Sequence, residues 1–432
     1  MIRKFSLFAC ALFCVWQTTA QTQETQTDEL TLSLEQACNF AREHNRTMQN
    51  AALDIKIAEA TRWQTIASML PQVNASLDYS NMMGYKMNLG VMSIAMPPSG
   101  TITVTASAAV NGQQIVGVLL NDIAKEMSQI NAKKSEHDIV SQTTSLYVSI
   151  LAMKQNVALL DSSLQNLTAL ETATQNAANA GAAVQTAADQ ITVQVALMKN
   201  NINATKRSLE MLYNSLKLQL GTTADKTLVL TQTIDDFLNE EAILSLLMSN
   251  LDMNNNFDYQ LVKKNTELAQ KQVTMAAMNY TPTLSVMYQY AAKEIYSDEV
   301  SMNTTPPNMF GLSLKVPLFS SGKNFMTVKE KKLARNAAEN TKADTEDRLR
   351  VQDRQLRYDL TSSYENYQVQ KKNIEVTTRV FNNLSDKFQH GMASNVEVTN
   401  ASTDLISAQN TYITALLNFV NAHIALKKLL NK

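Results

Sequence analysis

The stretch that decides the fold runs from residue 391 to residue 430 and reads GMASNVEVTNASTDLISAQNTYITALLNFVNAHIALKKLL. After its first residue it contains no glycine and no proline, so nothing in it interrupts a helix. Side chains of one seam recur at steps of three or four: Val398, Ala401, Leu405, Ala408, Tyr412, Leu416, Phe419, His423, Leu426 and Leu430. A second seam, seven residues apart, is formed by Ile406, Ile413 and Val420. The pattern predicts a helix over 395–430 held between two neighbours, as in the wall of a tube. The alternative is a stripe that faces an ordinary globular core.

The composition predicts long helices in the rest of the chain as well. Only 10 glycines and 7 prolines occur in 432 residues, well below the roughly 12% that these two residues usually share. Charged residues make up 18% of the chain, against roughly 25% in an ordinary soluble domain. The formal net charge of −1 excludes the basic excess of a nucleic-acid-binding protein. After the N-terminal segment, no apolar run reaches the roughly 18 residues of a transmembrane helix.

Residues 1–20 have the three-part layout of a secretory signal peptide. Arg3 and Lys4 precede an apolar run over 5–16, and cleavage is expected after Ala20. Two of the three cysteines lie in this segment. A processed chain therefore keeps only Cys38, which can form no internal disulfide and is expected to be a buried small side chain.

The few glycines and prolines indicate an internal duplication with an offset of 210 or 211 residues. Three pairs of markers share this offset: Pro71 and Pro282, Gly112 and Gly322, and Gly181 and Gly391. We divide the chain into a first repeat over 21–220, an equatorial or linker segment over 221–250, and a second repeat over 251–432.

Within each repeat the apolar period changes from helical to strand-like and back. The first repeat is predicted to contain a helix over 33–70, strands at about 72–82 and 101–110 on either side of a loop over 81–100, a long helix over 113–179 and a helix over 182–220. The second repeat is predicted to contain an opening helix, strands at about 283–290 and 309–318, a long helix over 323–389 and a last helix over 395–430. The fold class is therefore mainly α with a β portion.

The helix lengths predict how the helices stack. The helix over 113–179 would be about 100 Å long, which is several times the width of a compact domain. The helices over 33–70 and 182–220, placed end to end, match that length. We therefore expect two shorter helices to lie along one long helix, with the segment over 221–250 packed as a separate layer beside their junction.

The four strands predict a place in a membrane. Strands of roughly 8 to 11 residues can cross a bilayer with tilt. Aromatic residues near them resemble the belts of membrane interfaces: Tyr79, Tyr280, Tyr288, Tyr290, Phe310 and Phe319. Four strands cannot close, and an open edge in hydrocarbon leaves backbone groups unpaired at several kcal/mol each. Three chains would supply twelve strands, enough for a pore. The alternative is a soluble β-layer that caps a coiled coil.

The element order, given twice after a signal peptide, resembles the TolC-like outer-membrane factor family, also called outer membrane efflux proteins. Four stretches carry the resemblance: Leu32-Ser33-Leu34-Glu35-Gln36-Ala37, Leu70-Pro71-Gln72-Val73, Val316-Pro317-Leu318-Phe319-Ser320-Ser321-Gly322, and Gly391 through Leu430.

The resemblance implies a homotrimer whose long coiled-coil helices form an α-helical barrel across the periplasm, below a twelve-stranded transmembrane β-barrel in outer-membrane lipid. It also implies a passive exit duct of a tripartite efflux or type I secretion system, served by a periplasmic adaptor and an inner-membrane transporter. No cofactor, metal, nucleic acid or catalytic site is expected.

One site can be carried over from the family. There, the turn between the last two helices is followed by two acidic residues, three apart, that ring the closed periplasmic aperture. The matching positions are Glu397 and Asn400, and the equivalent positions of the first repeat are Ala187 and Gln190. Of these four positions, only Glu397 carries an acidic side chain. In a trimer, three Glu397 carboxylates around the axis would attract cations. The hairpin tips expected to contact the adaptor are Gly181, Ala182, Ala183, Gly391, Met392 and Ala393.

Glu397 has a second interpretation. Ser394 and Glu397 have the spacing of a capping box, in which the glutamate satisfies the Ser394 N–H at the positive end of the helix. The gate and the cap both stand as hypotheses.

Other functions are less well supported by the residues. A methionine cluster could suggest soft-metal contact, although adaptable gap filling is favoured: Met82, Met83, Met87, Met92 and Met96. A soluble periplasmic coiled-coil scaffold or adaptor is the alternative to the duct. An enzyme is disfavoured because no acid, base or nucleophile can be assembled from the sequence.

Overall fold

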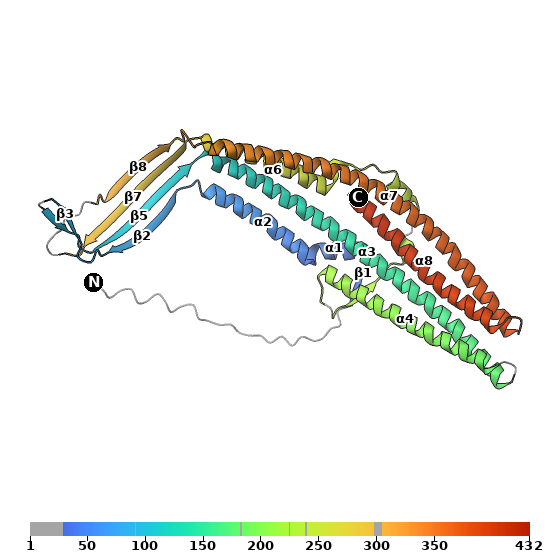
Figure 1. Cartoon of the computed structure of the whole chain (residues 1–432). Helices are drawn as coiled ribbons and strands as arrows, with labels where there is room; N and C mark the ends of the chain where they lie inside the picture. Colours follow the sequence, from blue (N-terminus) through green and yellow to red (C-terminus); the bar gives the residue numbers. More distant parts are fainter. Residues whose placement is uncertain (1–28, 91, 182–183, 224, 238–239, 298–304) are drawn as a thin grey trace.

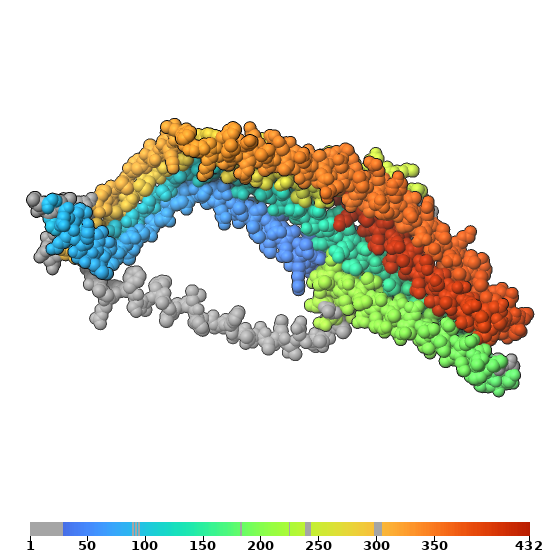
Figure 2. Space-filling view, in the orientation of Figure 1, coloured from blue at the N-terminus to red at the C-terminus, as the bar shows by residue number. Residues whose placement is uncertain are grey.

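The computed structural model describes residues 29–432 apart from 91, 182–183, 224, 238–239 and 298–304. The predicted signal peptide lies outside these residues. The molecule is long and arched, with a β-sheet at one end and helices that run from it to two hairpin turns at the other (Figure 1, Figure 2). Among the described residues, no helix combines the length and apolar character needed to cross a bilayer.

The first long helix, α3 (Gly112–Asn179), is flanked by shorter helices placed end to end. Beside its first part lie α2 (Arg46–Ala67) and α1 (Leu34–His44), and beside its second part lies α4 (Gln185–Leu220) (Figure 1). The expected stacking of two shorter segments along one long helix is therefore observed.

The second long helix, α7 (Lys323–Gln389), is flanked in the same way by α6 (Phe257–Ala277) and α8 (Asn395–Leu429). Since α3 also contacts α6 and α8, the helices form one continuous wall, with α7 at one margin and the α2/α4 row at the other.

The helix expected over 33–70 is in fact two helices, because Asn45 interrupts it. Asn45 has an extended backbone (φ −65°, ψ 129°) and ends α1 while capping α2. Its Oδ1 accepts from the Thr47 N–H at 2.7 Å, and its Nδ2 donates to the Gln219 carbonyl at the end of α4 at 2.7 Å. One side chain thus fixes both the helix break and the joint with α4.

The same joint recurs in the second repeat. Asn256 caps α6 through its Oδ1 and donates from its Nδ2 to the Leu429 carbonyl at the end of α8, at 3.2 Å. The pairs Asn45–Gln219 and Asn256–Leu429 are related by the 210- or 211-residue offset. The predicted duplication therefore extends to individual hydrogen bonds.

The main sheet has four antiparallel strands in the order β2-β5-β7-β8. These are β2 (Gln72–Ser80), β5 (Ser99–Val110), β7 (Thr283–Ile295) and β8 (Asn308–Lys315). Strand β5 leads into α3 and strand β8 into α7, so the strand order sets the order of the helices in the wall.

Several expected bounds need correction. The strand over 283–290 continues to Ile295, and the strand over 309–318 ends at Lys315, two residues before Pro317, which has no N–H to donate. The strand over 72–82 ends at Ser80, and the helix over 182–220 begins at Gln185. The segment 81–100, expected to be a loop, contains the antiparallel hairpin β3 (Lys86–Leu89) and β4 (Met92–Ala95).

A small layer covers the middle of the wall. It contains the parallel strands β1 (Glu29–Leu32) and β6 (Thr227–Leu230), the short helix η1 (Ile234–Phe237) and the helix α5 (Glu240–Leu247). Tyr147 of α3 is fully buried beneath it and donates its hydroxyl to the Leu32 carbonyl at 3.0 Å. The parallel pairing joins segments about 200 residues apart and was not anticipated from the local pattern.

Arg357 of α7 fastens the C-terminal end of α5 to the wall. Its guanidinium donates to the carbonyls of Leu247 and Ser249, each at 2.5 Å, and forms an ion pair with Asp353 at 2.9 Å. These carbonyls belong to a helix end that has no intrahelical donors left, so Arg357 acts as a C-terminal cap supplied by another helix.

The seam predicted in the last helix is confirmed. Val398, Leu416 and Leu426 are fully buried, and His423 is half-buried at the same seam. Ile413 and Val420 of the second seam are also buried. α8 therefore packs on two sides, against α7 and against α3.

Gly221 gives a test of the end-to-end joint. It has φ +74°, and a Cβ there would lie 2.3 Å from the His44 carbonyl oxygen. We expect Gly221→Ala to lower the free energy of unfolding by about 3 kcal/mol, because both strain and a backbone clash arise. Chemical unfolding in detergent, followed by far-UV circular dichroism, measures this.

The matched control is Gly181→Ala, with φ +76° and no atom within 4 Å of the added Cβ. At this position we expect the free energy of unfolding to fall by only about 1 kcal/mol, because the substitution strains the backbone without creating a clash. Equal losses in both variants would contradict the role assigned to the joint.

Candidate functional site

The four-stranded sheet has one apolar and one polar face. The register aligns the even-numbered residues of β5, β7 and β8 with the odd-numbered residues of β2. The apolar face consists of Val73, Ala75, Leu77, Tyr79, Ile102, Val104, Ala106, Ala108, Val110, Leu284, Val286, Tyr288, Tyr290, Phe310, Leu312 and Leu314. The other face is mostly Ser, Thr, Asn and Gln. Leu77, Phe310 and Leu312 are 76%, 70% and 67% exposed in the single chain. A sheet of this kind fits between lipid and water.

The two outer strands have only one partner each. In the described part of the chain, β2 pairs only with β5, and β8 only with β7. The free edges carry backbone N–H and C=O groups that an apolar surrounding would leave unsatisfied. Strand pairing with further copies of the chain would satisfy both edges.

At the opposite end, two helical hairpins carry the predicted aperture residues. The turns are made by Gly181 (φ +76°) and Gly391 (φ +71°), which adopt the left-handed conformation that ends α3 and α7. The two turns lie close together at the end of the wall (Figure 1). Of the predicted tip residues, Met392 is 70% exposed and Ala393 is half-buried, while Ala182 and Ala183 lie outside the described residues.

Glu397 is exposed and forms the capping box. Its carboxylate accepts from the Ser394 N–H at 2.7 Å and from the Ser394 hydroxyl at 2.8 Å, and its own N–H donates to Ser394 Oγ at 3.3 Å. The Ser394 backbone N–H, and then its hydroxyl, lower the pKa of the Glu397 carboxyl. The capping interpretation is confirmed, and the carboxylate remains open to solvent.

Asn395 connects the two hairpins and was missed in the sequence. Its side chain, in a residue only 9% exposed, donates from Nδ2 to Gln190 Oε1 at 2.7 Å and to the Ala187 carbonyl at 3.2 Å. Both acceptors are positions carried over from the family pattern. The only local signal was a polar residue at the first position of a helix, which does not reveal a partner some 200 residues away.

A groove of about 430 Å³ separates α4 from α8 beside this contact. Gln190 and Asn400 line the same groove, whereas Ala187 takes part through its carbonyl and Glu397 bonds back to its own helix end. The groove lining is Asp189, Gln190, Val193, Gln194, Val396, Thr399 and Asn400. Of the four predicted aperture residues, Gln190 and Asn400 therefore line one groove, and only Glu397 is acidic.

The other candidate groups have structural surroundings. Cys38 is buried, its Sγ lies 3.8 Å from Thr144 Oγ1, and burial raises the pKa of its thiol. Burial lowers the pKa of the His423 imidazole. Among the described residues, no group of three or more His, Cys, Asp and Glu side chains could hold a metal ion. Met82 and Met83 are 52% and 91% exposed.

Comparison with known proteins identifies relatives of this architecture. Residues 249–432 match the outer membrane efflux protein family. No curated protein matches the chain. Three solved structures share its fold, each at 14% sequence identity and each aligned over 92% of this chain. They are the CmeC outer membrane channel of Campylobacter jejuni, aligned over 85% of its own length with a TM-score of 0.75, and the outer membrane protein VceC of Vibrio cholerae, aligned over 95% with a TM-score of 0.73. The third is the open state of the MtrE outer membrane channel of Neisseria gonorrhoeae, aligned over 88% with a TM-score of 0.71. The predicted family resemblance and fold class are confirmed.

The cap predicts a pH dependence of the α8 N-terminus. Because the folded pKa of Glu397 lies below its ordinary value of 4.5, the cap stabilises the helix end at neutral pH and is lost as the pH falls below that value. Hydrogen exchange of the amides at 395–398 should therefore accelerate in acid relative to Glu397→Gln measured at the same pH. An identical pH response in the two proteins would contradict this assignment.

Proposed function

We propose, from the family match over residues 249–432 and the outer membrane channel fold of the whole chain, that three copies form a passive exit duct in the outer membrane. The duct would serve a tripartite efflux or type I secretion system. Substrates would pass from the periplasm to the exterior without chemical change, so the chain is proposed to be no enzyme.

The observation that carries the proposal is the sheet with one apolar face and with two edges that no strand of the described residues pairs. Placed in lipid with the apolar face outward, four strands satisfy their edges only by pairing β8 of one copy with β2 of the next. Three copies give twelve strands, which leaves an aqueous interior lined by the polar face.

The length of the helical wall supports the proposal that the duct extends into the periplasm. α3 has 68 residues and is about 100 Å long. Since α3 follows directly from β5, a closed barrel of strands would continue into a closed barrel of helices. The hairpin tips would then lie far from the outer membrane, where a periplasmic adaptor and an inner-membrane transporter can reach them.

The tips supply the narrow end of the proposed duct. Three Glu397 carboxylates, together with Asn400, Gln190 and Ala187, would surround the axis there. Asn395 holds α8 against α4 within one chain, so we propose that it keeps the two hairpins together in the closed aperture. The gate and the cap are compatible, because a capping carboxylate that is exposed still contributes its charge.

The membrane face can be tested with two neighbouring residues on opposite faces of β8. Leu312→Lys places a charge on the apolar face, at a cost of about 2–4 kcal/mol near the middle of a bilayer. Ser313→Lys places the same charge on the polar face. We expect Leu312→Lys to abolish the heat-modifiable trimer in the outer-membrane fraction and Ser313→Lys to preserve it.

A wild-type chain that fractionates as a soluble periplasmic monomer would refute the duct and favour the scaffold alternative. Equal loss of trimer in both variants would refute the assignment of the two faces.

The gate can be tested by ion selectivity in planar bilayers. Glu397→Gln removes three charges from the proposed trimer, and Glu397→Lys reverses them. If Glu397 acts at the aperture, cation preference should fall in the first variant and turn toward anions in the second. If Glu397 acts only as a helix cap, both variants should have less stable hairpin tips and unchanged ion selectivity. That result would reject the gate.

A further inference from the structure

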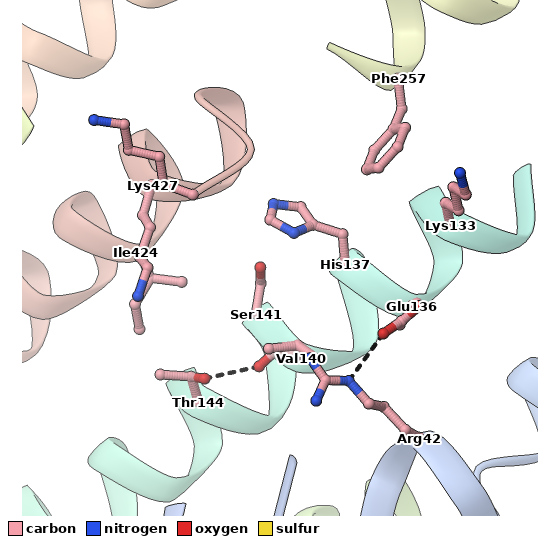
Figure 3. Close-up of a pocket in the computed structure, with 11 residues that line it drawn as sticks. Arg42, Lys133, Glu136, His137, Val140, Ser141, Thr144, Phe257, Ile424 and Lys427 are labelled. Atoms are coloured by element: carbon pink, nitrogen blue, oxygen red, sulfur yellow. Dashed lines mark hydrogen bonds and ion pairs between the residues drawn. The ribbon is translucent and has the colours of Figure 1, made fainter. Parts of the chain in front are cut away.

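A pocket lies where the shorter helices end against α3. α1 ends at His44, α6 begins at Phe257 and α8 ends at Leu429, so packing on this part of α3 is interrupted. The resulting cavity has a volume of about 470 Å³ and is lined from α1, α3, α6 and α8 (Figure 3). It lies over α3, between α1 on one side and α6 and α8 on the other.

The charges that line this pocket do not balance. Arg42 is paired with Glu136 at 3.0 Å, and Glu136 is the only acidic side chain among the described residues of the lining. Lys133 and Lys427 also line the pocket and form no ion pair within the described part of the chain. Lys432 donates to the Ser249 hydroxyl instead.

The adjacent lysines make the contrast clear. Lys134 is paired with Asp258, and Lys428 is paired with Asp138 at 2.8 Å. Each thus has an acidic partner, while its pocket-lining neighbour, Lys133 or Lys427, does not. The excess positive charge is therefore local to the pocket, in a chain whose formal net charge is −1.

The space between the two lysines offers both hydrogen-bonding and apolar contacts. His137 Nε2 lies 3.1 Å from the Lys428 carbonyl oxygen, which can only accept, so this nitrogen donates within the protein and the Ser141 hydroxyl is the neutral donor left for a ligand. Figure 3 shows the His137 ring and the Ser141 hydroxyl facing the same space, opposite Phe257, with Lys133 and Lys427 on opposite sides of the ring. Val140 and Ile424 complete an apolar lining.

We propose that this pocket binds a soluble organic dianion, with one anionic group near Lys133, the other near Lys427, and an apolar linker against Phe257, Val140 and Ile424. A monoanion would satisfy only one of the two cations. Membrane lipid is not the source, because His137 lies 25 residues along α3 from its first residue at the sheet, a distance of about 38 Å.

The proposal does not rest on the duct and is tested by calorimetry on the full-length protein in detergent. The probes are pimelate, which carries two carboxylates, and hexanoate, which carries one. We expect pimelate to bind at about millimolar concentration or below and hexanoate at least about tenfold more weakly. Lys133→Gln and Lys427→Gln should each weaken pimelate binding about three- to tenfold, bringing it toward the hexanoate level.

Lys134→Gln is the matched control, since this neighbour on the same helix already has its acidic partner. It should leave pimelate binding unchanged. No pimelate binding at about 10 mM, equal binding of hexanoate, or an equal loss in Lys134→Gln would each overturn the proposal. All three results can be obtained whether or not the protein proves to be a duct.

Discussion

The structure depends on the need to pair the backbone groups of an open sheet. Four strands with an exposed apolar face leave the outer edges of β2 and β8 without partners among the residues that the structure describes. In water such an edge invites aggregation, and in lipid it costs several kcal/mol for each unpaired group. The single chain is therefore an incomplete unit, and the proposed duct is the arrangement in which further copies would complete its edges.

The sheet also sets the arrangement of everything below it. Each strand is joined in sequence to one helix, so the order β2-β5-β7-β8 fixes the order of the α2, α3, α6 and α7 rows. Two long helices provide continuity, and the shorter ones are joined end to end by asparagine side chains at Asn45 and Asn256. Both joints use the same bond from a capping amide to a helix-terminal carbonyl, which satisfies groups that two helix ends would otherwise leave unpaired.

These joints have consequences for the rest of the wall. The small layer of β1, β6, η1 and α5 lies near the Asn45 joint. The positively charged pocket lies near the Asn256 joint, where α6 begins and α8 ends. At the far end, Asn395 makes a third amide contact, this time between hairpins. The side-chain amides of Asn45, Asn256 and Asn395 thus each join one helix end to another helix.

The sequence by itself determined the features that depend on local periodicity and spacing. The seams of the last helix, the alternation of the strands, the Ser394–Glu397 cap and the 210-residue duplication all follow from residues close together or from repeated markers. Only the tertiary structure decided which distant segments meet. The β1–β6 pairing, the joint at Asn45 and the Asn395–Gln190 contact depend on partners 174 to 205 residues away. The unpaired Lys133 depends on the absence of an acidic partner among the described residues. A capping asparagine has the same local pattern whether or not it also reaches a second helix, so its second bond is set by packing alone.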